Sequence, residues 1–306
     1  MTPRVRTAPS SPDKVLWPQA GITKQDLWDY YEAVADRLLP GLAGRPLTLK
    51  RFPDGLGGDG FFQKNLPPST PGHVERFASW SESSGRTVTY AVARTTDDLR
   101  WCAQTAALEL HPWFARVDRP ERPDTLAFDL DPGERPVPAA AAARRLRTVL
   151  DDLGLASLVK TSGKRGLHIY VPIERRYTYE EIRGFGLGVA RCCAAAHPED
   201  LTVEMRKARR SGRLLLDWSR NGPAQTLVAA WSPRAVEAAT VSLPLAWEAV
   251  TDALDPQRFT LRTAPELPDA WADPPRPQRL EQARERLQAE GFDCADRNPR
   301  SDKPFS

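Results

Sequence analysis

The chain has 306 residues, of which 41% are hydrophobic and 27% charged, and its formal net charge is +3. This length allows one large domain or two small ones with a sizeable core, and the small net charge excludes a strong basic field over the whole molecule. Binding to nucleic acid would therefore depend on local clusters such as Arg206, Lys207, Arg209 and Arg210, although a solvated basic turn fits the same residues. The four cysteines lack metal-binding or disulfide spacing, and no apolar run is typical of a signal peptide or a membrane span, so we expect a cytoplasmic protein.

Hydrophobic periodicity predicts a mixture of helices and strands without strict alternation, which favours an α+β fold. The first 10 residues are polar and rich in proline, which predicts a flexible arm, and a second group of prolines at 264–278 predicts a linker. We therefore expect an arm (1–10), a main domain (11–263), and a linker with a C-terminal helix and tail (264–306). The predicted helices are 23–39, 99–110, 138–153, 178–196, 245–253 and 280–292, and the predicted strands are 47–52, 86–93, 125–131, 158–161 and 167–171.

The predicted strand at 125–131 ends in two carboxylates, Asp129 and Asp131, just before a proline and a glycine. Residues two apart share a face of a strand, so these like charges repel unless a cation lies between them. A divalent metal with oxygen ligands suits such a pair, although two solvated aspartates before a turn give the same pattern. A third acid, Asp217, follows another apolar run, Leu214–Leu216.

A glycine-containing turn lies between the predicted strands 158–161 and 167–171, with the sequence Ser-Gly-Lys-Arg-Gly at 162–166. Its backbone N–H groups, together with Ser162, Lys164 and His168, could cradle phosphates, although a hairpin whose charges face water fits as well. The turn lacks the Gly-Lys-Ser/Thr ending of a P-loop. Three strand-end aspartates and a phosphate-binding turn are what metal-assisted phosphoryl transfer requires.

A series of short motifs runs along the chain: Asp13–Pro18, Arg51–Gly55, Phe61–Asn65, Glu109–Trp113, Phe128–Pro132, Ser162–His168, Leu216–Asn221 and Val241–Trp247. With these motifs, roughly residues 10 to 260 resemble the polymerase domain of bacterial ligase D, a member of the archaeo-eukaryotic primase superfamily. The resemblance implies a primase-like catalytic core with mixed and antiparallel sheets flanked by helices. It also implies a template-directed DNA or RNA polymerase that acts at breaks or gaps in non-homologous end joining, with a preference for ribonucleotides.

The resemblance also implies roles for individual residues, several of which have an ordinary structural alternative. His111 would lie near the primer end, although a satisfied, half-buried histidine is the usual case. Phe61 and Phe62 would stack on bases if they lie in a loop, whereas in a strand one would enter the core. Two Mn²⁺ or Mg²⁺ ions would bind Asp129, Asp131 and Asp217. The nucleotide would contact Lys50, Arg51, Ser162, Gly163, Lys164, His168, Arg210 and Arg234. The DNA would contact Lys14, Lys24, Phe61, Phe62 and Lys64, the first two at a 5′-phosphate.

The implied partners are nucleoside triphosphates, primer-template DNA with a 5′-phosphorylated gap or end, a DNA-end-binding Ku protein and a separate ligase. No membrane partner is expected, and the protein would be associated with the nucleoid. Three places depart from the family pattern: Ser11 replaces a common Asn, Arg220 stands where Gln is frequent, and Ala230 and Trp231 replace the usual Pro-Tyr. No Lys-x-Asp-Gly ligase motif is present, so a stand-alone polymerase and an excised domain both remain open. A two-metal nuclease or a non-catalytic DNA-end-binding module would use some of the same residues.

Overall fold

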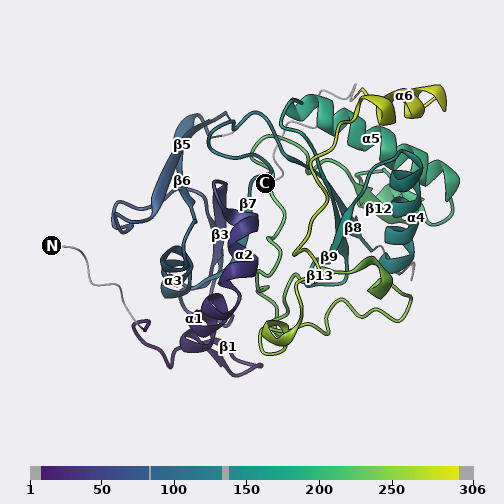
Figure 1. Ribbon diagram of the computed structural model, residues 1–306. Helices are drawn as coiled ribbons and strands as arrows, with labels where there is room; N and C mark the ends of the chain where they lie inside the picture. The colour runs from purple at the N-terminus through teal and green to yellow at the C-terminus, as the bar shows by residue number, and fades with distance from the viewer. Residues whose placement is uncertain (1–7, 83, 133–137, 296–306) are drawn as a thin grey trace. The chain divides into compact units, whose positions relative to one another are not determined.

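The computed structural model describes residues 8–82, 84–132 and 138–295, so most of the predicted arm and the predicted tail beyond residue 295 lie outside the described residues (Figure 1). The chain divides into two compact units. The predicted boundary at residue 263 remains a prediction. Unit 1 contains residues 1–113, 226–243 and 257–268, and unit 2 contains residues 114–225, 244–256 and 269–306.

Unit 1 contains a five-stranded antiparallel sheet organised around β3 (Pro46–Arg51). Strand β3 pairs with β4 (Phe61–Gln63), β6 (Arg86–Val92) and β7 (Ala107–Pro112), and β5 (Glu75–Ser81) pairs with β6. In the β3–β7 ladder, position 50 lies opposite 109 and position 48 opposite 111. This register brings a predicted nucleotide-binding position next to the Glu-Leu-His-Pro-Trp motif.

The helical part of unit 1 begins with α1 (Lys24–Ala33), which follows the small hairpin of β1 (Val15–Trp17) and β2 (Ile22–Thr23). Thr23 is the N-cap, because its hydroxyl accepts from the Asp26 N–H while the Asp26 carboxylate accepts from the Thr23 N–H. The single helix predicted at 23–39 is wrong in one respect, since a break at position 34 separates α1 from α2 (Ala35–Leu42).

The helix predicted at 99–110 is wrong in its second half. Helix α3 (Thr96–Gln104) ends early, and Ala106 then adopts a left-handed conformation with φ of +52° that reverses the chain. The following residues form β7, all six of which are buried. A short apolar run buried on both faces cannot be distinguished from a helix by periodicity, which explains the error.

Unit 2 contains a six-stranded sheet in which only the β11–β12 pair is parallel. This arrangement confirms the α+β fold with mixed and antiparallel sheets. Strand β8, with the two aspartates at its end, lies between β12 and β10. The strands in spatial order are β11 (Leu201–Thr202), β12 (Leu214–Asp217), β8 (Thr125–Asp131), β10 (Leu167–Pro172), β9 (Leu158–Thr161) and β13 (Pro244–Leu245).

Helices α4 (Ala139–Asp152) and α5 (Tyr179–Ala196) pack against β8 on one face of this sheet (Figure 1). The approach of α5 is close, because a Cβ added at Gly186 would lie 3.1 Å from Cδ1 of Leu126. Leu126 therefore faces the helices, and by alternation Asp129 faces the other way. Helix α5 begins with a capping box, in which the side chains of Thr178 and Glu181 each accept from the other's backbone N–H group.

The helix predicted at 245–253 is wrong, because its first residue, Leu245, belongs to β13 (Pro244–Leu245) and only a 3₁₀ turn over Trp247–Ala249 follows. Pairing with the edge of β9 fixes these residues in the sheet. The proline-rich segment packs closely: the Trp271 indole donates to the Val159 carbonyl at 3.1 Å, and α6 (Glu281–Ala289) buries Leu287.

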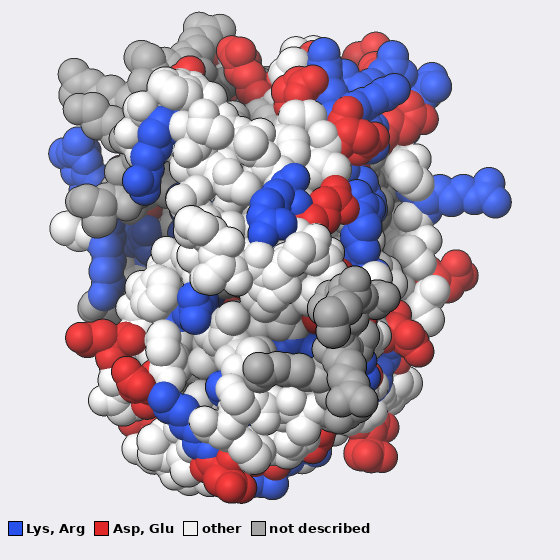
Figure 2. Space-filling view, turned by 90° about the vertical axis from the view of Figure 1, so that its left-hand side faces the viewer, with Lys and Arg blue, Asp and Glu red and all other residues white. Residues whose placement is uncertain are grey.

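No helix within the described ranges is both long and apolar enough to cross a membrane. Figure 2 shows acidic and basic side chains interspersed over one face of the molecule, as the small net charge leads us to expect. Binding of a polyanion would therefore depend on particular residues rather than on a broad field.

Candidate active site and nucleic-acid interface

A row of charged and polar side chains crosses the sheet of unit 2. In the antiparallel ladders Asp217 lies opposite Asp129, Asp129 opposite His168, and His168 opposite Lys160. Directly opposed residues share one face, and this face is the one turned away from α5. Strand order thus brings four positions from four different strands side by side. We call these four residues the strand row.

Asp217 is held by the turn that follows it. Its Oδ1 accepts from the Ser219 N–H at 2.9 Å and the Ser219 hydroxyl at 2.6 Å, and its Oδ2 accepts from Arg220 Nε at 3.1 Å. Only 4% of the residue is exposed. These contacts fix the carboxylate without any residue distant in sequence, and they assign a partner to Arg220, which departs from the family pattern.

Asp129 lies between the other members of the strand row, and 22% of its side chain is exposed. Burial alone would raise its pKa, but the adjacent His168 and the more distant Arg220 and Lys160 outweigh burial, and the pKa of Asp129 lies below its usual value. The His168 Nε2 is 3.4 Å from Asp129 Oδ1. Asp129 is therefore a carboxylate at neutral pH.

Lys160 is fully buried, and its Nζ lies 2.8 Å from Nδ1 of His168, which is itself only 3% exposed. The sequence analysis missed Lys160. A signal was present, because pairing residues 161 and 167 across the five-residue turn places position 160 opposite 168. The contact orients the His168 ring so that its other nitrogen faces Asp129.

The backbone of Asp131 lies in β8 opposite Leu215, and its side chain is outside what the structure describes. Among the side chains that are described, no three His, Cys, Asp or Glu groups are arranged to hold a metal ion. The structure brings Asp129 and Asp217 together, and the site of three carboxylates stays a prediction.

The turn between β9 and β10 is closed by Ser162. Its hydroxyl oxygen accepts hydrogen bonds from the N–H groups of Lys164 at 3.1 Å and Gly166 at 3.2 Å. These two backbone N–H groups thus have partners inside the turn. Gly163 has a φ of +68°, and a Cβ at Gly166 would lie 2.4 Å from the Leu130 carbonyl oxygen. Both glycines are therefore required by the backbone. The Lys164 side chain is exposed.

A second charged group lies in unit 1, around the buried carboxylate of Glu109 in β7. Its Oε2 is 2.8 Å from Nε2 of His111. Its Oε1 is 3.4 Å from Nε of Arg234 and 3.7 Å from Nζ of Lys50, and accepts from the Ala235 N–H at 2.9 Å. We call Glu109, His111, Arg234 and Lys50 the Glu109 cluster. It joins three residues for which the resemblance implies a role.

The pKa of Glu109 lies well below its usual value. Burial by itself would raise it, but the hydrogen bond from His111, the charge of Arg234 and the Ala235 N–H outweigh burial. Sequence reasoning quoted Glu109 in a motif and gave it no role. The signal was the i, i+2 spacing of Glu109 and His111, which share a strand face, but the residues before His111 were assigned to a helix.

A family model for the primase-polymerase domain of LigD matches residues 23–275. The chain belongs to this family. The multifunctional non-homologous end joining protein LigD of Mycolicibacterium smegmatis is 38% identical over 247 residues, which are 79% of this chain and 32% of that protein. The bifunctional LigD of Bacillus subtilis is 35% identical over 257 residues, 83% of this chain and 41% of that protein. The chain thus spans less than half the length of these relatives.

Among solved structures, the polymerase domain from Mycobacterium tuberculosis ligase D in complex with DNA matches with a TM-score of 0.80 and 35% identity. The match covers 86% of this chain and 94% of that one. The family resemblance and the primase-like fold inferred from sequence are therefore confirmed.

The two aromatic residues expected at the DNA of a LigD polymerase domain lie in β4, at the edge of the sheet of unit 1. Phe61 is 46% and Phe62 58% exposed. They therefore lie in a strand rather than in a loop, and neither ring enters the core. The Lys50 Nζ is 5.6 Å from the Phe62 ring centre, and Arg51 lies 5.5 Å from that of Phe61. Lys64, which follows the strand, is exposed.

Two arginines expected at the nucleotide in the LigD family hold backbone carbonyls. Arg51 Nε donates to the Thr105 carbonyl at 2.7 Å, and burial lowers the pKa of its guanidinium. Arg210 donates to the carbonyls of Glu204 at 3.0 Å and Met205 at 2.9 Å. Both arginines thus order the chain around them, and their contacts to nucleotide remain predictions.

The two lysines expected at a 5′-phosphate are adjacent in space, since the Lys24 N–H donates to the Lys14 carbonyl at 2.8 Å. The Lys14 ammonium pairs with Asp54 at 2.8 Å. Lys24 is 7% exposed, and its ammonium donates to the Ser10 carbonyl at 3.1 Å. Lys14 is therefore the better placed of the two to meet a solvent-borne phosphate.

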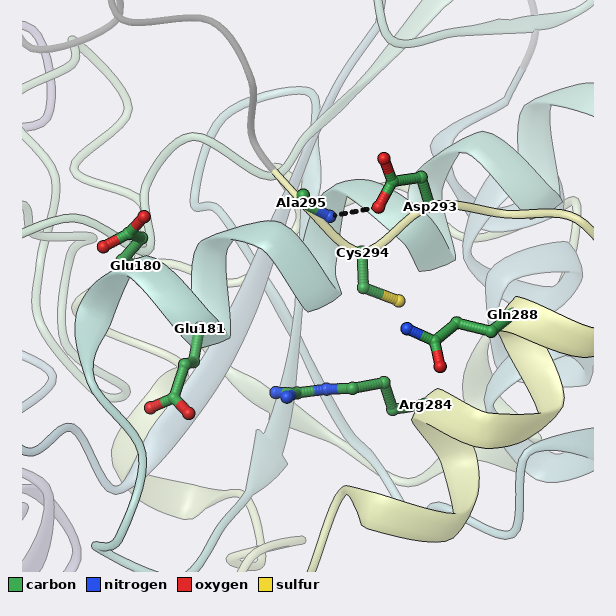
Figure 3. Close-up of a pocket in the computed structure, with 7 residues that line it drawn as sticks. All are labelled: Glu180, Glu181, Arg284, Gln288, Asp293, Cys294 and Ala295. Carbon is green, nitrogen blue, oxygen red and sulfur yellow. Dashed lines mark hydrogen bonds between the residues drawn. The ribbon is translucent and has the colours of Figure 1, made fainter.

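A pocket of about 270 Å³ lies in unit 2 beside α5 and α6. Figure 3 shows the Arg284 side chain extending between Glu181 and Cys294. None of the residues with an expected LigD role lines it. The lining residues are Glu180, Glu181, Arg284, Gln288, Asp293, Cys294 and Ala295. Three carboxylates and one arginine do not suit a triphosphate.

Proposed function

We propose that the chain is a template-directed nucleotidyltransferase that adds nucleotides to primer 3′ ends at DNA breaks or gaps during non-homologous end joining. The observation that carries the proposal is the strand row, in which Asp129 and Asp217 stand directly opposite each other beside His168. The names of the relatives supply the end-joining context, and the solved relative was determined in complex with DNA.

The donor set of the strand row suits a divalent metal. Asp129 is ionised, Asp217 is oriented by its own turn, and both offer the hard oxygen ligands that Mn²⁺ and Mg²⁺ prefer. We propose that these two carboxylates, with Asp131, hold two such ions. Bound metal would neutralise charge on the α-phosphate and lower the pKa of the primer hydroxyl.

Other protein groups would bind the nucleotide and the primer. His168, oriented by Lys160, and the Ser162 turn would hold the triphosphate through hydrogen bonds. In unit 1, Lys50 and Arg234 would supply positive charge to the nucleotide, with Gly163, Lys164, Arg51 and Arg210 as further contacts. His111 would hydrogen-bond near the primer end. The polymerase would add ribonucleotides in preference to deoxyribonucleotides.

The DNA contacts would come from unit 1. Phe61 and Phe62 would stack on bases, Lys64 would contact the backbone, and Lys14 with Lys24 would bind the 5′-phosphate of the downstream strand. Ku and a separate ligase are the partners that would bring the protein to a break and seal the product.

The proposal is tested by extension of a labelled primer across a one-nucleotide gap, with and without manganese, using deoxy- and ribonucleotides and each of the templating bases. We expect addition of the complementary nucleotide, and none by Asp129→Asn. Shortening of the primer would favour a two-metal nuclease. Binding of the gapped DNA without any product would favour an end-binding module.

A further inference from the structure

Glu109 is the least exposed member of its cluster, yet it contacts every other member. Only 1% of its side chain is exposed, compared with 22% for Lys50 and 11% each for His111 and Arg234. The carboxylate is thus covered by groups that themselves reach solvent. A group so placed does not touch substrate, but it determines where its partners point.

We propose that Glu109 is a positioning residue of the primer-extension reaction, which orients His111, Arg234 and Lys50 together. This inference rests on the proposed function, because that function gives its three partners their roles.

The two carboxylate oxygens serve different partners. Oε2 faces His111 at 2.8 Å, while Oε1 faces Arg234 at 3.4 Å and Lys50 at 3.7 Å. Without the anion between them, the two permanent cations would repel each other. The carboxylate therefore allows two positive charges to be held at one place, which is what binding a polyanionic nucleotide requires.

The cluster joins parts of the chain that are far apart in sequence. The β3–β7 register sets Lys50 opposite Glu109, and the Ala235 N–H bonds to the carboxylate at 2.9 Å across 126 positions. Glu109 is thus the point at which the loop carrying Arg234 meets the sheet carrying Lys50 and His111.

The backbone of this loop has anchors that do not depend on Glu109. The Leu110 N–H donates to the Ser232 hydroxyl at 2.9 Å, and the Ala229 N–H donates to the Leu110 carbonyl at 2.8 Å. Replacing Glu109 should therefore leave the loop attached to β7 while releasing the side chains. This separation makes a positioning role distinguishable from a purely structural one.

The test is a double-mutant cycle on single-nucleotide addition, with kcat and the KM for the nucleoside triphosphate measured for wild type, Glu109→Gln, Arg234→Ala and the double variant. We expect Glu109→Gln to raise KM about ten- to a hundredfold, the range for losing a hydrogen bond to a charged group, and to lower kcat as well through His111. In the Arg234→Ala background the same change should raise KM much less, because the two residues act through one contact.

Two further variants separate this effect from misfolding. Glu109→Asp keeps the charge and should recover part of the loss. Glu75→Gln is the matched control, since Glu75 also pairs with an arginine in unit 1 but 40% of its side chain is exposed, and it should leave kcat and KM unchanged. If Glu109→Gln does not fold, as judged by thermal unfolding, the cycle is run with Glu109→Asp.

Wild-type kinetics in the Glu109 variant, or effects of Glu109 and Arg234 that simply multiply, would overturn the inference. A kinetic loss that follows only the fraction of unfolded protein would overturn it too. A folded wild type that does not extend primers would overturn the proposed function and this inference together. An active wild type with an unaffected Glu109→Gln would overturn the inference alone.

Discussion

The strand row of unit 2 and the Glu109 cluster of unit 1 both set carboxylates beside cationic groups, but different parts of the fold link their members. In the row, each residue comes from its own strand and lies opposite its neighbours across the ladder. In the cluster, one carboxylate touches all the others. The backbone ladder keeps the remaining row positions in place when one side chain is lost, whereas the loss of Glu109 releases three partners.

The carboxylates of Asp129 in the row and Glu109 in the cluster also differ in exposure. The Asp129 side chain is 22% exposed, and the Glu109 side chain is 1% exposed. Asp217, the other carboxylate proposed to hold metal, is only 4% exposed, so low exposure alone does not mark a supporting carboxylate. The comparison teaches that the surroundings distinguish Asp129 from Glu109: Asp129 lies between ladder neighbours, whereas Glu109 is enclosed by three side chains, although both pKa values are lowered.

The largest expected effect comes from breaking the row. Asp129→Asn and Asp217→Asn should each reduce the rate of nucleotide addition on the order of a thousandfold, because a metal-binding charge is lost at the reacting centre. Single-turnover primer extension measures the rate, and a gel shift on the same preparations should show retained DNA binding. Asp118→Asn is the control, since Asp118 pairs with Arg175 in unit 2 and is 62% exposed. Comparable activity in the Asp217 variant would remove that residue from the site.

A second prediction concerns the acid stability of the cluster. Because the pKa of Glu109 is lower in the folded chain, its contribution to stability is fully present above the pKa of an unfolded glutamate, about 4.3, and is lost as the pH falls below it. Glu109→Gln should lower the free energy of unfolding at neutral pH by about 1.5–3 kcal/mol.

The same variant should also show a shallower loss of stability on acidification than wild type, since it has no carboxylate to protonate at this position. Urea unfolding at neutral pH and at a pH of about 3, well inside the window below the unfolded pKa, measures both quantities. Parallel stability curves for the two proteins would mean that Glu109 is not held as a carboxylate by His111, Arg234 and Lys50.

A third prediction sharpens the comparison at the edge of the cluster, where Phe62 lies against both His111 and Lys50. Phe62→Ala should weaken binding of gapped DNA by about 1–3 kcal/mol through lost base stacking. It should change stability by less than about 0.5 kcal/mol, since the ring is exposed. Fluorescence anisotropy with labelled DNA measures the affinity. Trp80→Ala, at another exposed aromatic of unit 1, should have little effect, and an equal loss there would contradict a specific platform.

The smallest expected effect lies at Lys14, whose ammonium pairs with Asp54 on the surface. Asp54→Asn should strengthen the preference for gapped DNA with a 5′-phosphate by a few-fold at most, because exposed pairs contribute about 0.2–1 kcal/mol. Lys14→Ala should weaken that preference. The measured quantity is the ratio of affinities with and without the phosphate, at low and at moderate salt. An identical ratio in all three proteins would leave Lys14 without a role at the phosphate.

The strand row could largely be predicted from sequence because its signals are local. Asp129 and Asp217 end apolar runs, and two glycines mark the turn before His168. The register that sets Asp217 opposite Asp129 was not readable, because it depends on strand pairing across 88 positions.

The Glu109 cluster could not be predicted, for a related reason. Its members lie in two strands and a loop, and their meeting depends on long-range closure of the fold. Assigning the start of β7 to a helix also hid the shared face of Glu109 and His111. Phe61 and Phe62 fit neither expectation, a loop or a strand with one ring in the core, because the short edge strand β4 leaves the side chains on both of its faces exposed.

The central claim is that the strand row carries out nucleotide addition, while the Glu109 cluster positions groups that bind the nucleotide. Nucleotide titrations of single-turnover primer extension, run side by side on Asp217→Asn and Glu109→Gln, test it most directly. The account predicts that Asp217→Asn loses the maximal rate at every nucleotide concentration. It predicts that Glu109→Gln shifts the half-saturating concentration about tenfold or more upward and lowers the maximal rate far less than Asp217→Asn does. A Glu109 variant as inactive at saturation as the Asp217 variant, or an Asp217 variant rescued by more nucleotide, would contradict it.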